Sequence, residues 1–210
     1  IKNLGMGCSS RTGKMEQHGN VAPTVKTERC TSCGACIRVC AHDAITSEKG
    51  KAVILPDACV GCARCITICQ DRAILINWGS ESALVMKKMA EYALGALYGK
   101  KGKALFVNFV TQVSPSCDCY GHSDSPIVPD QGILVSTDPV AIDQASADLV
   151  NRAVGLPQTA LANGHEEGGD KFRGVHPDID WQATLEHGEK IGLGSRSYDL
   201  VELQPKGKNW

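Results

Sequence analysis

Residues 28–45 read ERCTSCGACIRVCAHDAI, and residues 57–74 repeat the pattern as DACVGCARCITICQDRAI. Each copy spells C-x2-C-x2-C-x3-C, the spacing of thiolates that hold cubane iron–sulfur clusters. The eight cysteines are Cys30, Cys33, Cys36, Cys40, Cys59, Cys62, Cys65 and Cys69. Because a complete run occurs twice, the pattern predicts two [4Fe–4S] clusters and therefore electron transfer. Structural zinc or disulfides are the alternative for the same cysteines.

The surroundings of the two runs predict a small folded module over residues 22–78. Each run is expected to form a tight loop followed by about one helical turn. The apolar side chains expected to pack on the clusters are Ile37, Val39, Ile66 and Ile68. Short strands are expected beside the loops at residues 21–25, 45–47, 52–55 and 74–77. Residues 48–51, which read EKGK, are typical of a hairpin turn.

Helix and strand patterns alternate after this module, which predicts an α/β layer. Helices are expected at residues 82–98, 138–154 and 181–191, the second with Asp138 as N-cap and Pro139 in the first turn. Strands are expected at residues 104–110, 132–136 and 199–203, the first of them fully buried. Glycine- and proline-rich stretches at residues 114–130 and 163–178 predict long loops.

Composition and charge restrict the partners of the chain. Aromatic residues make up only 5%, and lysine and arginine are scattered, which argues against nucleic acid. No apolar run approaches the ~18 to 20 residues that span a bilayer. The formal charge of −1 becomes about −5 with two bound clusters, so we expect a redox partner protein with a basic docking patch. The cysteine spacing argues for metal ligation in a reducing compartment, which predicts a cytoplasmic protein.

Three cysteines lie outside the two runs. Cys117 and Cys119 are in a long loop with His122 nearby, and Cys8 is in a glycine-rich segment that precedes His18. Thiolates with an imidazole are a reasonable ligand set for zinc or an additional iron–sulfur centre. The predicted third site therefore consists of Cys8, Cys117, Cys119 and either His122 or His18. Ordinary thiols in tight turns are the alternative.

Two carboxylates, Asp138 and Asp143, are candidates for acid–base chemistry in principle. For Asp138, capping of the following helix is a sufficient explanation. Residues 165–170, which read HEEGGD, are more typical of a solvated acidic loop than of a cation site.

Residues 22–78 resemble the bacterial two-cluster [4Fe–4S] ferredoxins. In those proteins the fourth cysteine of each run ligates the other cluster. The resemblance implies that cluster one takes Cys30, Cys33, Cys36 and Cys69. It implies that cluster two takes Cys59, Cys62, Cys65 and Cys40. Ala41 and Gln70 stand where that family usually has proline, so the rigidity of the loops and the reduction potentials are expected to differ.

Segments across nearly the whole chain resemble the iron–sulfur family known as domain of unknown function 362. They are residues 2–7, 13–14, 116–119, 127–130, 132–134 and 136–143, of which the last, STDPVAID, is the most specific. The resemblance implies a ferredoxin-like two-cluster module inserted into a larger α/β domain, hence an α+β or α/β fold. The implied parts are an N-terminal segment of the α/β domain (1–21), the module (22–78) and the α/β domain of unknown function (79–210). It also implies that part of the α/β domain precedes Ile1.

The favoured function is an iron–sulfur electron-transfer protein that passes single electrons to or from a redox partner. The alternative is a redox enzyme, an oxidoreductase or a subunit of one. In that enzyme the clusters would feed the third site of Cys8, Cys117, Cys119 and a histidine. Both functions stay open at this point because electron transfer is common to them.

Overall fold

The computed structural model describes residues 1–18, 22–75, 82–117 and 121–203. The chain divides into two compact units, residues 1–99 with 180–184 and residues 100–179 with 185–210. The described part consists of helices and small two-stranded antiparallel sheets, so the fold is α+β. Of the two predicted classes, α+β and α/β, the first is confirmed. Among the described helices, none is both long and apolar enough to cross a membrane. The domain bounds given above stay a prediction.

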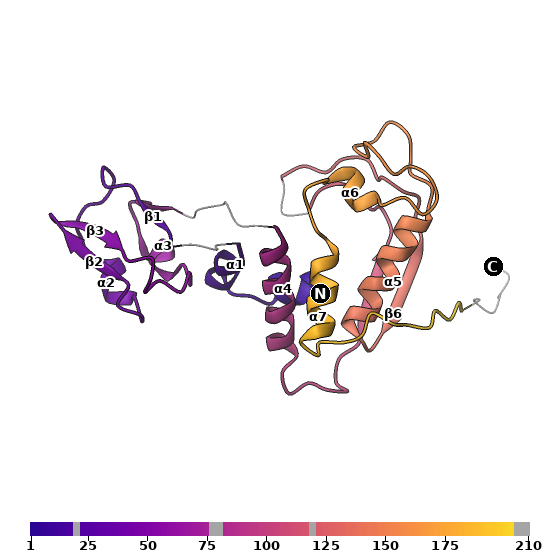
Figure 1. Ribbon diagram of the computed structural model, residues 1–210, viewed down its shortest axis with the longest axis horizontal. Helices are drawn as coiled ribbons and strands as arrows, with labels where there is room; N and C mark the ends of the chain where they lie inside the picture. The colour runs from indigo at the N-terminus through magenta and orange to yellow at the C-terminus, as the bar shows by residue number, and fades with distance from the viewer. Residues whose placement is uncertain (19–21, 76–81, 118–120, 204–210) are drawn as a thin grey trace, which may run out of the picture. The chain divides into compact units, whose positions relative to one another are not determined.

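Two small sheets and two short helices form residues 22–75 of the first unit (Figure 1). Strand β1 (Thr24–Val25) pairs with β4 (Ile74–Leu75), and β2 (Ile45–Glu48) pairs with β3 (Lys51–Ile54). Helices α2 (Ala35–Val39) and α3 (Arg64–Ile68) carry the later part of each cysteine run and pack against each other.

The hairpin between β2 and β3 is confirmed at its predicted position. Its two-residue loop consists of Lys49 and Gly50, with φ of 47° and 77°. Positive φ at both loop residues matches the twist of the flanking strands. The outer predicted strands are confirmed only in part, because residues 21, 76 and 77 lie outside the described ranges.

The core of these residues is built partly from the cysteines themselves. Cys36, Ile45, Ala52, Cys65 and Ile74 are buried and packed together. The repeat offset relates Cys36 to Cys65 and Ile45 to Ile74. The two repeats therefore contribute matching side chains to one core.

The N-terminal residues form a π-helix, η1 (Asn3–Gly7), and an α-helix, α1 (Arg11–His18), neither of which the sequence pattern predicts. Helix α4 (Ser82–Leu97) confirms the predicted helix after the module. Helix η1 packs so closely on α4 that a Cβ at Gly5 would overlap the carbonyl oxygen of Met89. Only glycine fits this contact.

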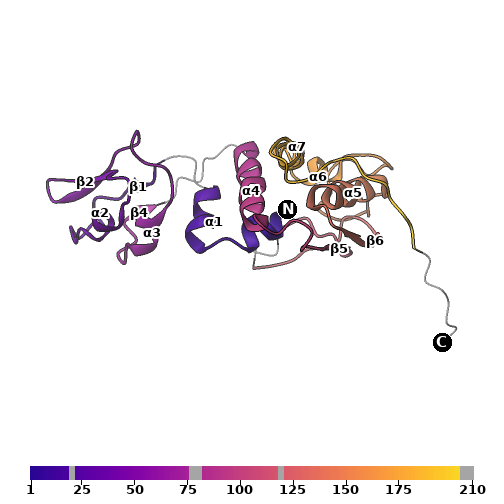
Figure 2. The ribbon, with the colours of Figure 1, turned by 90° about the horizontal axis from the view of Figure 1, so that it is seen from below.

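A helix covers one face of a small sheet in the second unit. Strand β5 (Phe106–Val110) pairs with β6 (Gly132–Ser136), and α5 (Pro139–Arg152) lies against them (Figure 1, Figure 2). These elements confirm two predicted strands and the predicted helix. The opposite face of the sheet is exposed, with Phe109 at 67% and Ile133 at 61%. The expectation of a fully buried strand at 104–110 is therefore wrong, because α5 covers only one face.

The remaining described elements are two helices, α6 (Lys171–Val175) and α7 (Gln182–Lys190). The second confirms a prediction, whereas α6 lies inside a stretch predicted to be loop. The side chain of Asp170 caps α6 by accepting a hydrogen bond from the N–H of Arg173 at 2.9 Å. The strand predicted at residues 199–203 is wrong, since this segment pairs with no described strand. A strand needs the backbone groups of a neighbour to complete its hydrogen bonds.

Candidate functional site

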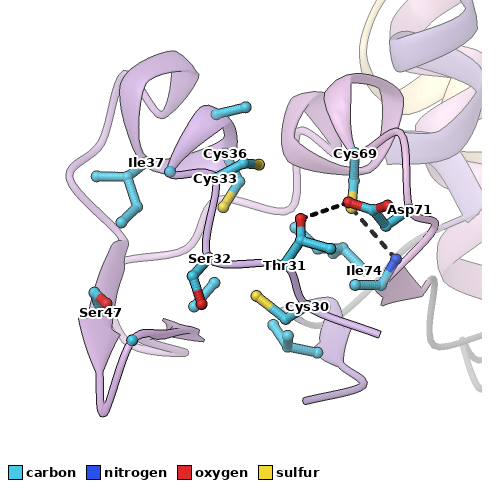
Figure 3. Close-up of a pocket in the computed structure, with 16 residues that line it drawn as sticks. Cys30, Thr31, Ser32, Cys33, Cys36, Ile37, Ser47, Cys69, Asp71 and Ile74 are labelled. Carbon is cyan, nitrogen blue, oxygen red and sulfur yellow. Dashed lines mark hydrogen bonds between the residues drawn. The ribbon is translucent and has the colours of Figure 1, made fainter. Parts of the chain in front are cut away.

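The first cysteine loop lines a cavity (Figure 3). Its wall contains Cys30, Cys33 and Cys36 of the first run together with Cys69 of the second run. The empty space is about 480 Å³, part of it open to solvent. The structure thus brings together, around one cavity, the four residues that the ferredoxin resemblance assigns to cluster one.

Apolar side chains make up most of the rest of the wall of this cavity. Val25 and Ile74 come from the β1–β4 sheet, Ile37 from α2 and Ala52 from β3. Low polarity strengthens the interactions between charges inside a cavity. The potential of an iron–sulfur cluster depends on this kind of burial.

The fourth cysteine of each run accepts a backbone hydrogen bond in the same way. The N–H of Ala44 donates to Sγ of Cys40, and the N–H of Ala73 donates to Sγ of Cys69, both at 3.3 Å. Hydrogen bonds of this kind stabilise a charged sulfur. They also help to set the potential of a cluster that the sulfur ligates.

Both cysteine loops use the left-handed backbone region at matching positions. Ser32 and Gly61 have φ of 65° and 72°, and Gly34 and Ala63 have φ of 68° and 58°. A residue with a side chain pays about 1–2 kcal/mol for this conformation. It nevertheless occurs at Ser32 in one loop and at Ala63 in the other. Left-handed residues in such loops direct successive N–H groups into a concavity, an arrangement found at phosphate and iron–sulfur sites.

Hydrogen bonding and burial act in opposite directions on the thiols of the first loop. Backbone hydrogen bonds from Ala52 and Ser32 lower the pKa of Cys30. Burial raises the pKa of Cys36. A thiolate at Cys36 therefore needs compensating positive charge, which a bound metal supplies.

The second loop brings Cys59 and Cys62 close to Cys65. Burial raises the pKa of Cys65 to about 12, and the nearby thiols of Cys59, Cys62 and Cys36 add smaller contributions in the same direction. Cys40, the fourth predicted ligand, packs against the same core as Cys65. Thiols gathered in this way cannot all ionise unless positive charge balances them.

No three His, Cys, Asp or Glu side chains converge on a position for a single metal ion within the described ranges. A zinc ion binds its ligands at about 2.0–2.3 Å from one point. A [4Fe–4S] cluster instead takes one cysteine on each of its iron atoms, so its ligands stand farther apart. Within the described ranges, the four thiols that line the first cavity therefore do not meet at one point.

The residues of the predicted third site come from both units of the chain. Cys8 is exposed after η1, and His18 ends α1, both in the first unit. Burial, and next the charge of Lys2, lower the pKa of His18. Cys117 and His122 belong to the second unit, and Cys119 lies outside the described residues. This site stays a prediction.

The two carboxylates of the STDPVAID segment have structural partners. Oδ1 of Asp138 accepts hydrogen bonds from the N–H groups of Val140 and Ala141 at 2.8 and 2.9 Å. Its other oxygen accepts one from the N–H of Ser195 at 2.9 Å. Asp143 accepts a hydrogen bond from the side-chain amide of Asn108 at 2.9 Å, which links α5 to β5. Capping of α5 by Asp138 is therefore confirmed.

Two basic side chains beside the first loop were not predicted. Nζ of Lys51 donates to the carbonyl oxygen of Cys30 at 2.5 Å, and Nη1 of Arg38 donates to that of Cys33 at 3.2 Å. Arg38 lies inside the first run, five residues after Cys33. The sequence alone therefore places this side chain near the loop. Lys51 is 21 residues from Cys30, and only the folding of the β2–β3 hairpin brings it there.

Comparison with known proteins gives one family match. The family model described as domain of unknown function (DUF362) matches residues 1–148. This range contains both cysteine runs and ends within α5. No curated protein and no solved structure matches the chain.

Proposed function

The chain belongs to the DUF362 family, and we propose that it is an iron–sulfur electron-transfer protein that exchanges single electrons with a redox partner. The observation that carries the proposal is the cavity on which cysteines of both runs converge. Cys69 is the decisive member, because the closely spaced cysteines of the first run can hold only part of a cluster. A fourth ligand from the other run is the arrangement of two-cluster ferredoxins.

The proposed ligands of the first site are Cys30, Cys33, Cys36 and Cys69. Those of the second site are Cys59, Cys62, Cys65 and Cys40. A bound [4Fe–4S] cluster supplies one-electron reduction and oxidation. The protein supplies the thiolates, hydrogen bonds from the N–H groups of Ala44 and Ala73, and an apolar wall.

The short helices and strands and the small core of residues 22–75 favour bound metal. The segment contains two-stranded sheets and five-residue helices, and two of its five buried core residues are cysteines. An isolated pair of strands is marginally stable, and a domain of ~60 residues or fewer buries too little surface for large stability. The eight cysteines of the runs form no disulfide in the described part of the chain. Metal ligation is one way to hold such a segment together.

The test is metal and sulfide analysis of anaerobically reconstituted full-length chain. We expect ~8 iron and ~8 acid-labile sulfide per chain, and an electron paramagnetic resonance signal after reduction. Cys69→Ser is expected to halve the iron content. Lys49→Gln, in the loop of the β2–β3 hairpin, serves as the control that retains it. A preparation that binds zinc and contains no acid-labile sulfide refutes the proposal.

A further inference from the structure

We propose that the two predicted cluster sites have unequal reduction potentials, and that Lys51 and Arg38 make the first site the more easily reduced. The inference rests on the proposed function, because it concerns the same cysteines. It comes from an arrangement of charge that the first loop has and the second lacks within residues 22–75.

Lys51 is held against the start of the first loop. It begins β3, is half-buried, and its Nζ donates to the carbonyl oxygen of Cys30 at 2.5 Å. A partly buried cation is screened less by salt than a fully solvated one.

Arg38 lies against the other end of the same loop. Its Nη1 donates to the carbonyl oxygen of Cys33 at 3.2 Å. The same nitrogen is 3.2 Å from the position that a Cβ of Gly34 would take. The guanidinium group of this otherwise exposed side chain is therefore folded back onto the loop backbone.

The second loop has no basic counterpart of Arg38. The repeat offset of 29 residues places Thr67 there, and its hydroxyl donates to the carbonyl oxygen of Arg64 at 2.8 Å. Arg64 itself is exposed. Within residues 22–75, no basic side chain donates to a carbonyl group of the second loop. The counterpart of Lys51 is Ser80, which lies outside the described residues.

One carboxylate opposes the two cations. Asp71 lines the first cavity, and its Oδ2 accepts a hydrogen bond from the hydroxyl of Thr31 at 2.7 Å (Figure 3). Its counterpart in the other repeat is the exposed His42. The first loop backbone thus binds two cations directly, and one hydrogen-bonded carboxylate lies beside them.

Cations held against a cluster-binding loop favour reduction because reduction adds a negative charge. Charge and hydrogen bonding near an iron–sulfur cluster set its potential. The effect of a nearby cation falls with distance, so cations bound to the loop backbone act more strongly than distant ones. The one-electron-reduced protein then holds its electron at the first site, beside the exposed Cys33.

The test is a potentiometric titration of the reconstituted full-length chain, followed by electron paramagnetic resonance. Lys51→Gln and Arg38→Gln are expected to lower only the higher of the two potentials. The expected change in the equilibrium constant for reduction is about tenfold, which is about 59 mV for one electron. Lys51→Arg and Arg38→Lys retain the charge and are expected to leave the potential near that of the wild type. Lys49→Gln, on the same hairpin, is the matched control.

Thr67→Arg provides an independent test that removes no native contact of the first loop. It is expected to raise the lower potential and bring the two closer together. If the chain binds ~8 iron and ~8 sulfide but neutralising Lys51 and Arg38 shifts neither potential, the inference is refuted and the proposed function stands. If the chain binds no iron–sulfur cluster, both are refuted.

Discussion

Replacing Asp138 distinguishes a structural from a catalytic role for the STDPVAID segment. Its Oδ1 caps α5 through the N–H groups of Val140 and Ala141, and Oδ2 accepts from the N–H of Ser195. Gly194 lies so close that a Cβ there would overlap the carboxylate. The carboxylate therefore joins the start of α5 to a segment 57 residues later in the chain.

The expected loss for Asp138→Ala is about 2 kcal/mol. The cap contributes about 1 kcal/mol, and the hydrogen bond from Ser195 contributes about 1 kcal/mol at this half-buried position. Asp138→Asn keeps a capping oxygen but presents an amide N–H to the N–H of Ser195. That variant is expected to lose only about 1 kcal/mol.

Hydrogen exchange of the α5 amides, followed by mass spectrometry, measures this loss locally. A local reading is needed because two compact units need not unfold as one. At about tenfold for each 1.4 kcal/mol, Asp138→Ala is expected to speed exchange about 30-fold and Asp138→Asn about 5-fold. The control is the exposed Asp199→Ala, for which we expect less than about 0.5 kcal/mol. Unchanged exchange in Asp138→Ala, combined with lost electron transfer, refutes the structural role.

Three further predictions concern other parts of the chain. Burial and a hydrogen bond to Asp148 raise the pKa of Tyr198 to about 12, above its ordinary value of about 10. The folded state therefore binds this proton more tightly, so its stabilising effect is complete below about pH 10 and is lost towards pH 12. Urea unfolding at several pH values is expected to show this loss in the wild type, and an equally steep loss in Tyr198→Phe contradicts it. Gly5→Ala is expected to destabilise the first unit by about 1–3 kcal/mol, because the added Cβ would meet a backbone carbonyl of α4. Gly7→Ala is the control, because a Cβ there meets nothing within 4 Å. Ala63→Gly is expected to keep the iron content because it relieves the left-handed backbone, and Ala63→Val is expected to reduce it; equal iron in both contradicts the loop argument.

Local elements were predictable where one short stretch carries the whole signal. The helix after Asp138 follows from a capping side chain and a proline in the first turn, and the β2–β3 hairpin follows from Lys49 and Gly50. The strand expected at 199–203 failed because apolar residues alone cannot supply the backbone partner that a strand requires. Helix α6 was missed because its five residues lie in a polar, glycine-rich stretch.

The sequence predicts which residues form the candidate site but not which other side chains surround it. Spacing identified the eight cysteines, and the positive φ values at Ser32, Gly34, Gly61 and Ala63 repeat with the same offset. Spacing says nothing of the surrounding charge. Lys51 and Asp71 reach the first loop only through folding of the segments that carry them.

The sequence by itself determined the two cysteine loops, because ligand spacing and turn conformation depend on residues within a few positions of one another. The ferredoxin resemblance already implied that Cys69 joins the first loop, whereas the tertiary structure alone decided that the wall of the cavity there is mostly apolar. It also decided that Lys51 donates a hydrogen bond to the first cysteine loop, and that Asp138 accepts one from the N–H of Ser195. These contacts join residues 21 to 57 positions apart or bring together the two runs. Their formation depends on the closure of long chain segments and on competition among many packings, which a local pattern does not record.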